Sequence, residues 1–150
     1  MGRFRHTFTV NAGISDVAAF HGSTQALKKL SLPLIGIQFH RLEPLAENSI
    51  SDFTMWIGPF PVRWVARHEE VIPDRGFVDV QESGPFQIWR HRHSFVSLND
   101  SHTKVIDEIE YEYSRIPWWY FTGHLMAWNL PLTFAYRAWV TRKSLQKEPE

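Results

Sequence analysis

The chain has 150 residues, a formal net charge of zero and no cysteine. A balanced charge argues against a nucleic-acid binder, which would show a basic surplus or stripe. Without cysteine there is no disulfide, no thiolate nucleophile and no cysteine-based zinc site. The length suits one domain with its own core, so we expect a single domain over residues 1–150. The first residues hold no apolar signal-peptide core, and we therefore expect a cytoplasmic protein.

The first part of the chain predicts a strand, two short helices and then more strands. Residues 3–10 alternate between apolar and polar side chains, which is typical of a half-buried strand. Short helices are expected near residues 15–22 and 23–30, and Pro33 ends the second. The next predicted strands cover residues 36–42, 49–57 and 62–72.

The stretch from Phe77 to Phe95 predicts two antiparallel strands joined by a turn at residues 82–85. Before it, the sequence from Pro73 to Gly76 is typical of a turn in which glycine supplies a positive φ. Successive side chains of a strand point to opposite faces. In the second arm Arg90 and Arg92 alternate with aromatic and histidine side chains, and the charged arginines should face solvent. We therefore expect one set of side chains to point inward: Trp89, His91, His93 and Phe95.

The last predicted strand, residues 102–113, has the clearest alternation, with glutamates facing solvent and Asp107 facing inward. It is followed by a predicted long helix from Trp118 to about Leu145, which Pro131 should kink. Apolar residues recur in this helix at steps of three to four, so we expect them to form one stripe against the sheet. The stripe consists of Phe121, Leu125, Trp128, Leu132, Ala135 and Trp139.

Residues 116–136 contain no Asp, Glu, Lys or Arg and are long enough to span a bilayer. The segment also holds polar side chains, a glycine and prolines, and it directly follows a strongly charged strand. We therefore favour a helix buried on one side over stable membrane insertion.

The predicted order is one strand, two short helices, six strands and one long helix. An antiparallel sheet with its helices on one side buries the apolar faces of such a set most simply. We therefore predict an α+β fold in which a curved antiparallel sheet wraps around the long C-terminal helix. A gap between sheet and helix would form a cavity.

The stretch from Phe77 to Phe95 has the pattern F-x-D-x-Q-x-x-G-P-F-x-x-W-x-H-x-H-x-F. This pattern resembles a bacterial branch of the START-like superfamily (SRPBCC), which includes ligand-binding START domains and polyketide cyclase/dehydrase-like proteins. The resemblance extends to Phe8–Asn11, to Phe20 with His21, and to Asp107 with Tyr111. It implies a helix-grip fold and binding of a small hydrophobic molecule.

Five polar side chains lie on the predicted inward faces of three consecutive strands: Asp79, Gln81, His91, His93 and Asp107. Neighbours across strands lie ~5 Å apart, so these groups can touch. Three interpretations stay open. They form an inert buried network, they anchor the polar end of a ligand, or they act in acid–base catalysis or bind a metal.

The apolar walls of the predicted pocket are Trp64, Trp89, Tyr111, Leu125 and Trp128. The chain has seven Trp and eleven Phe, which either line a cavity or fill a core. Arg137, on the last helix, either binds a ligand carboxylate or phosphate or extends to the helix edge.

From the sequence we predict binding of a small hydrophobic or amphipathic, lipid-like ligand. The alternative is a cyclase- or dehydratase-like enzyme that uses His91, His93 and Asp107 as acid–base groups. Two histidines and a carboxylate are suggestive of a metal but not specific for one, so we assign neither metal nor cofactor. Formation of a homodimer stays open.

Overall fold

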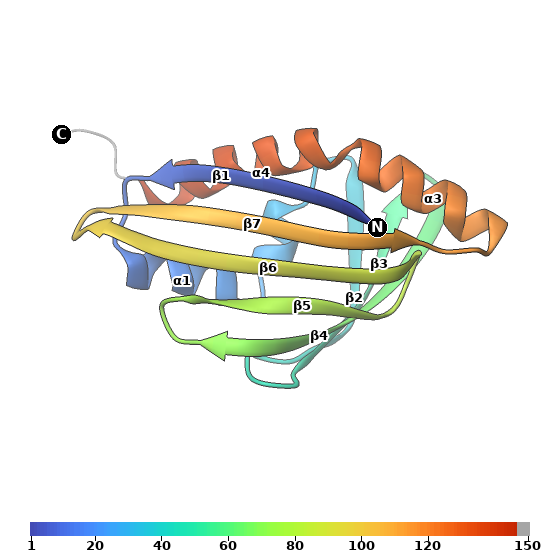
Figure 1. The fold of residues 1–150 in the computed structure, drawn as a ribbon, viewed down its shortest axis with the longest axis horizontal. Helices are drawn as coiled ribbons and strands as arrows, with labels where there is room; N and C mark the ends of the chain where they lie inside the picture. Colours follow the sequence, from blue (N-terminus) through green and yellow to red (C-terminus); the bar gives the residue numbers. More distant parts are fainter. Residues whose placement is uncertain (147–150) are drawn as a thin grey trace.

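Seven antiparallel strands form one sheet in the computed structural model, which describes residues 1–146 (Figure 1). Across the sheet the strands follow the order β1-β7-β6-β5-β4-β3-β2. Their bounds are β1 Gly2–Val10, β2 Ile35–Leu42, β3 Ile50–Ile57, β4 Phe60–Ile72, β5 Gly76–Ser83, β6 Phe86–Asn99 and β7 His102–Tyr113. Every strand therefore pairs with its neighbour in sequence except at the crossover, where β1 pairs with β7.

The helices are α1 Ile14–Gly22, α2 Ala26–Leu30, α3 Pro117–Trp128 and α4 Leu130–Leu145. In Figure 1, α4 runs alongside β1 and α3 extends past the end of β7. Helices α1 and α2 connect β1 to the opposite edge of the sheet, and both contact α4. The predicted architecture is confirmed: a curved antiparallel sheet, a C-terminal helical segment and two short helices after the first strand.

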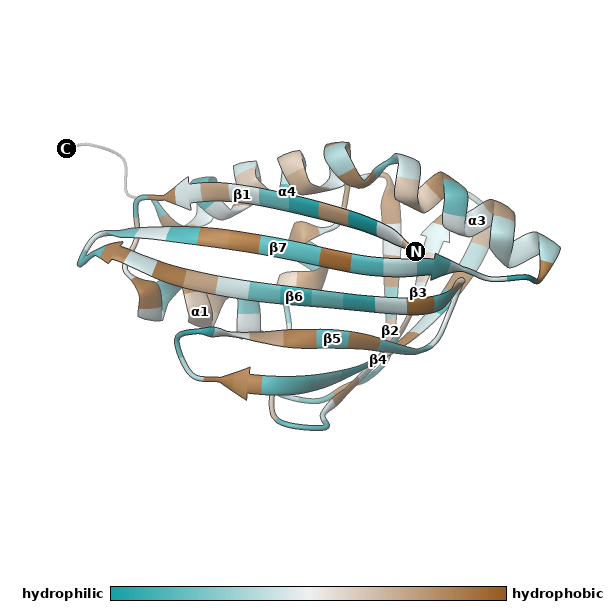
Figure 2. Ribbon diagram, viewed as in Figure 1, coloured by the Kyte–Doolittle hydropathy of each residue, from teal (hydrophilic) through white to brown (hydrophobic). Residues whose placement is uncertain are grey.

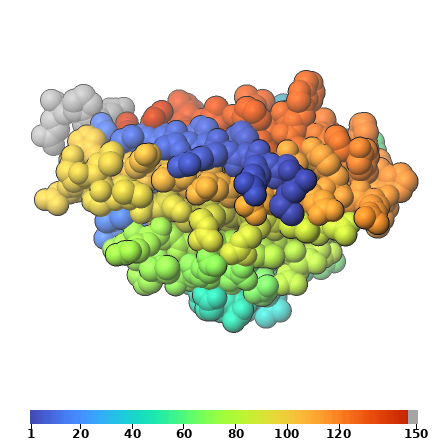
Figure 3. Space-filling view, viewed as in Figure 1, coloured from blue at the N-terminus to red at the C-terminus, as the bar shows by residue number. Residues whose placement is uncertain are grey.

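The alternation predicted for the strands is confirmed by their burial. In β1 the apolar positions are buried or half-buried and every intervening residue is exposed. In β6 the side chains of Trp89, His91, His93 and Phe95 are all buried, as expected. Figure 2 shows changes between brown and teal along β7, whereas the middle of β6 is teal because both its histidines and its arginines are hydrophilic. The outer face of β1, β7, β6 and β5 is the one seen in Figure 3.

Two residues of the turn and strand near residue 76 adopt unusual backbone conformations that fit the predicted turn. Asp74 has a φ of 59° and Gly76 a φ of 143°. A Cβ atom at Gly76 would overlap the carbonyl oxygen of His93 on the paired strand β6. Only glycine therefore allows β5 to begin this close to β6.

The C-terminal helix differs from the prediction in that it is two helices, separated at Asn129. Pro131 lies in the first turn of α4, where its missing N–H costs little. The backbone N–H and the side-chain Nδ2 of Asn129 both donate to the carbonyl of Leu125, at 3.3 and 2.8 Å, and so satisfy the end of α3. None of the helices within residues 1–146 is long and apolar enough to cross a membrane.

The predicted apolar stripe of this helix is wrong. Phe121, Leu132 and Trp139 are more than half exposed, and Trp128 is 82% exposed. The residues that face the sheet are Thr122, Gly123, Leu130, Phe134, Ala138 and Thr141. In α3 the cause is close approach, because a Cβ at Gly123 would lie only 3.2 Å from the Tyr113 ring. Small side chains therefore fit against the sheet at this point of α3, whereas α4 places Leu130 and Phe134 there.

Candidate functional site

A cavity of about 410 Å³ lies between the inner face of the sheet and helices α2 and α4. This volume is in the usual range for small-molecule sites. The wall is mainly apolar and draws side chains from both short and long helices and from the central strands. Its buried apolar members include Leu30, Phe53, Trp64, Ala66, Trp89, Leu130 and Phe134.

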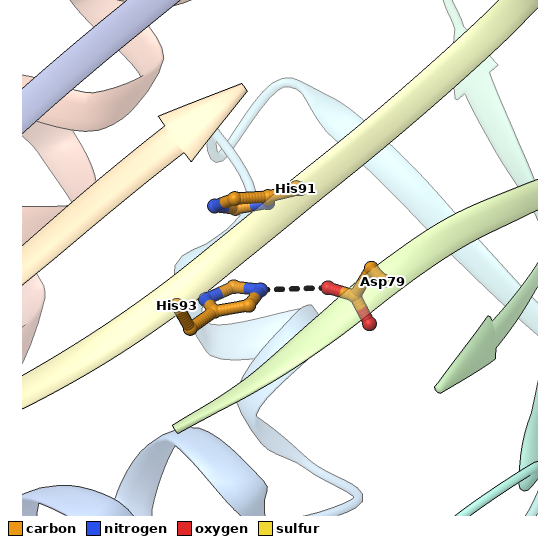
Figure 4. Close-up of side chains that lie close together, drawn as sticks. All are labelled: Asp79, His91 and His93. Carbon is orange, nitrogen blue, oxygen red and sulfur yellow. Dashed lines mark hydrogen bonds and ion pairs between the residues drawn. The ribbon is translucent and has the colours of Figure 1, made fainter. Parts of the chain in front are cut away.

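The polar and charged side chains of the wall include Glu43, Ser51, His68, Asp79, His91, Asn129, Thr133 and Arg137. Strand pairing brings two of them together, because Asp79 on β5 is directly opposite His91 on β6. One step further along, His93 on β6 is opposite Asp107 on β7. Figure 4 shows the rings of His91 and His93 lying one above the other, with Asp79 facing His93. Their ring centres are 3.8 Å apart.

The histidines and aspartates form a continuous chain of polar contacts across four strands. Nε2 of His68 lies 2.8 Å from Oδ1 of Asp79, and Oδ2 of the same carboxylate lies 2.7 Å from Nε2 of His93. Nδ1 of His93 is 3.3 Å from Oδ1 of Asp107, which also accepts a 2.8 Å hydrogen bond from Nε2 of His91. The sequence indicated that these polar groups can touch, and both histidine rings do contact aspartates.

The contacts assign the protonation states. Nε2 of His93 is hydrogen-bonded to Asp79, and its Nδ1 lies at ion-pair distance from Asp107 without forming a hydrogen bond. Because carboxylate oxygens face both nitrogens, the imidazolium form fits best. Burial alone would lower the pKa of His93, but Asp79 and Asp107 more than offset it and raise that pKa. The pKa of His68 is raised as well, because Asp79 outweighs its burial. At Asp79 and Asp107 the neighbouring histidines outweigh burial and lower the pKa of both carboxyl groups.

His91 differs from His93 although the two rings are neighbours. Burial, together with the positive charge of His93, lowers the pKa of His91 to about 4, and Asp107 offsets this only in part. Its Nε2–H donates to Asp107, which leaves Nδ1 as the unprotonated, accepting nitrogen of a neutral ring. The ring is also held edge-on to Phe134 of α4 at 5.4 Å. His91 therefore contributes an oriented, neutral imidazole to the cavity wall.

The structure divides the residues that the sequence proposed for the site. Trp64, Asp79, Trp89, His91 and Leu125 line the cavity. His93 and Asp107 lie behind its wall and are buried to 4% and 3% exposure.

Three other candidates are elsewhere. Gln81 holds the β5–β6 turn, because its amide donates to the carbonyl of Phe86 at 2.6 Å and accepts from the Phe86 N–H at 3.1 Å. Tyr111 and Trp128 line a separate open depression beside α3, and not the cavity.

Three further cavity residues bear on the chemistry of the site and were not predicted to belong to it. His68 alternates with Trp64 and Ala66 along β4, but a single strand gave no sign of its partner Asp79. Phe134 is buried in α4, although the predicted stripe placed other residues against the sheet. Arg137 lines the cavity, whereas the sequence left its direction open.

The side chains of Asp79, His91 and His93 place three metal-ligand atoms within 4.8 Å of one another. Both oxygens of Asp79 already contact histidines, and Nε2 of each stacked histidine faces a carboxylate. A metal ion at this place would have to displace those contacts. The arrangement is therefore described more simply as a hydrogen-bonded network.

No family model and no curated protein matches this sequence. Solved structures, by contrast, resemble it over nearly its whole length. A START superfamily protein from Mycobacterium smegmatis superposes with a TM-score of 0.71 at 14% identity, covering 96% of this chain and 97% of that one. An aromatase/cyclase from Streptomyces sp. R1128 gives a TM-score of 0.75 at 11% identity, covering 95% and 92%.

Norcoclaurine synthase from Thalictrum flavum, solved in complex with dopamine and hydroxybenzaldehyde, gives a TM-score of 0.68 at 15% identity, covering 99% of this chain and 89% of that one. At these identities the likeness is one of fold. The seven-stranded antiparallel sheet and the C-terminal helical segment confirm the fold that the motif between Phe77 and Phe95 implied. The chain has the helix-grip fold of START-like proteins.

Proposed function

We propose that the chain binds a small hydrophobic or amphipathic molecule in the cavity between the sheet and the C-terminal helices. The observation that carries this proposal is the cavity of about 410 Å³, whose wall is apolar except for a few converging polar groups. Sites for small molecules are built in this way: apolar surface supplies affinity, and a few fixed polar groups supply orientation. Trp64 and Trp89 meet edge to face at 5.2 Å and form a rigid aromatic wall.

The polar network supports this proposal because its side chains hold one another in place: His68, Asp79 and His91 line the cavity, and His93 and Asp107 lie behind its wall. His93 and Asp107 hold His91 from behind, and Asp79 lies between His68 and His93. A ligand hydroxyl or amide could donate to the neutral His91 ring without disturbing these bonds. The structural neighbours include an aromatase/cyclase and a synthase solved with two small aromatic molecules, which agrees with a ligand-binding fold.

The test is binding of N-phenyl-1-naphthylamine, a neutral apolar fluorophore whose emission rises in apolar surroundings. We expect saturable binding by the native protein and quenching of tryptophan emission. Ala66→Leu, which fills the cavity from β4, should weaken binding at least tenfold. The matched control is Trp128→Ser, which changes the open depression beside α3 and should leave the fluorophore affinity unchanged.

Native mass spectrometry of the purified protein complements this test, since a co-purifying lipid-like mass identifies the natural ligand class. Thermal unfolding of each variant separates lost binding from lost folding. The proposal fails if the native protein binds no fluorophore, or if Ala66→Leu binds it as tightly as the native protein does.

A second candidate function, acid–base catalysis of a cyclisation or dehydration, is favoured by one observation. His91 lines the cavity and its Nε2 is bonded to a buried aspartate, which is the arrangement of a general base. Under this reading His91 acts on the substrate, and His93 and Asp107 position it. His91→Gln should then abolish water loss from a poly-β-carbonyl substrate, followed by mass spectrometry, while fluorophore binding persists.

A further inference from the structure

Arg137 is placed differently from the other basic residues of its helix. It is half-buried and lines the cavity, with its guanidinium carbon 5.0 Å from the centre of the Phe134 ring. Arg142, one turn further, instead covers the Phe8 ring and donates to the carbonyl of Thr9 at 3.0 Å. Lys143 lies over Trp139 on the outer surface. Extension to the helix edge therefore describes Arg142 and Lys143 but not Arg137.

The guanidinium of Arg137 has no acid of its own. Within residues 1–146, no carboxylate oxygen lies within 4.0 Å of it. The nearby acids, Asp79 and Asp107, attract it through space, but each already contacts two histidines. Buried charges in proteins are normally paired and hydrogen-bonded. Arg137 is thus a cation whose hydrogen-bond donors are available to the contents of the cavity.

The charge balance of the interior specifies what would complement it. A third acid of the cavity wall, Glu43, is paired with Arg41 at 3.1 Å. With His68 and His93 protonated, two imidazolium rings balance the carboxylates of Asp79 and Asp107, and Arg137 leaves one positive charge in excess. A ligand group with a single negative charge would neutralise it, whereas a dianion would introduce a new unpaired charge. The planar guanidinium fork matches the two oxygens of a carboxylate.

We propose that Arg137 binds the carboxylate of a singly charged amphipathic ligand whose apolar body fills the cavity, an inference that rests on the proposed function. The contact with the Phe134 ring holds the guanidinium against the cavity wall, and the surrounding apolar wall strengthens the ion pair by excluding water. The predicted ligand class is therefore a small fatty or aromatic carboxylic acid.

The test is displacement of bound N-phenyl-1-naphthylamine by three ten-carbon probes at neutral pH: decanoate, decan-1-ol and decylamine. These probes share one apolar chain and differ in the charge of the head group. In the native protein decanoate should compete best. In Arg137→Gln its advantage over decan-1-ol should fall roughly ten- to a hundredfold, the usual worth of a hydrogen bond to a charged group. Arg137→Lys should retain part of that advantage.

The matched control is Arg142→Gln, which removes the same charge from the same helix outside the cavity. It should leave the competition by all three probes unchanged. Thermal unfolding of Arg137→Gln checks that the variant is folded, and competition is measured against the fluorophore affinity that this variant has. Equal competition by decanoate and decan-1-ol in the native protein, or equal weakening of both by Arg137→Gln, refutes the carboxylate inference alone. Failure of the native protein to bind the fluorophore refutes the proposed function, and this inference with it.

Discussion

The inner face of β5–β7 and the outer face of α3–α4 depart from the usual distribution of side chains in opposite ways. The inner face buries charged groups, with Asp107, His91 and His93 at 5% exposure or less. The outer face exposes aromatic and aliphatic groups, among them Trp118, Phe121 and Trp128. Polar side chains therefore lie inside the molecule while large apolar ones lie in solvent.

The two departures have different energetic consequences. A buried carboxylate is tolerable only while its partners are in place, because it has lost its water. Each member of the inner network is therefore sensitive to the loss of its neighbour. An exposed aromatic ring has few partners to lose, and its replacement alters folding little. Stability of the fold should thus depend strongly on the inner face and weakly on the outer one.

The largest effect should come from breaking the inner network at its shared oxygen. Asp107→Asn removes the charge that faces both His91 and His93 and leaves the His93 imidazolium without one of its two acids. We expect the free energy of unfolding to fall by about 3–5 kcal/mol, as for other broken buried pairs. Chemical denaturation near neutral pH measures this.

A double variant sharpens this prediction. Asp107→Asn combined with His93→Gln removes both charges, so its loss should be smaller than the sum of the two single losses. Simple additivity would mean that the two groups do not interact, contrary to the contacts described above.

The next largest effect should be a fall in the free energy of unfolding on mild acidification, by about 3 kcal/mol for each of two buried histidines, His21 and His91. Burial of His21, and burial of His91 beside His93, lower both pKa values from 6.5 to about 4. A lowered histidine pKa means that the unfolded chain binds the extra proton, so stability falls as pH drops from 6.5 to about 4. The raised pKa values of His68 and His93 act above that window, where stability falls as pH rises through them.

Denaturation curves collected across this pH range should show the slope, and His21→Gln should reduce it whatever its effect at neutral pH. His124→Gln, in which an exposed histidine of α3 is replaced, is the matched control. A slope that His21→Gln leaves unchanged would contradict the buried, neutral state of that ring.

The smallest effect should come from the outer face. Trp128→Ser should change the free energy of unfolding by no more than about 0.5 kcal/mol, the usual range for surface positions. Phe134→Ala, on the next helix but buried at 3% exposure, is the positive control and should cost about 3–5 kcal/mol. A large loss for Trp128→Ser would mean that the α3 surface is covered in the folded protein.

The strands could be read from the sequence because their period of two leaves only two choices of face. Arginines at 90 and 92 decide that choice for β6, and the glutamates at 108, 110 and 112 decide it for β7. The histidine pair and its acids were found in this way. The helices offered no such signal, since residues 116–136 carry no charged side chain to mark the solvent side. Large apolar residues were therefore placed inward, although Gly123 and Thr122 are the ones that fit.

It was harder to predict which residues line the cavity than to predict which face of the sheet a side chain occupies. Gln81 is half-buried, and its amide is used within a turn that the pattern could not reveal. Tyr111 follows the same alternation as Asp107 yet lies where the sheet has passed the end of the cavity. Whether an inward-facing residue lines the cavity depends on where along its strand the helices cross the sheet. The crossing point is set by the assembled fold and not by the pattern of one strand.

Gly76 imposes a restriction on variation that its position would not suggest. Turns at the edge of a domain normally tolerate change, but here the space for a side chain is taken by the main chain of His93. A larger residue would push β6 away and with it the ring that contacts both buried acids. A mutational scan should therefore find that residue 76 tolerates substitution as poorly as the residues of the network do. Substitutions there should change the titration of His93 more than they change the conformation of the turn.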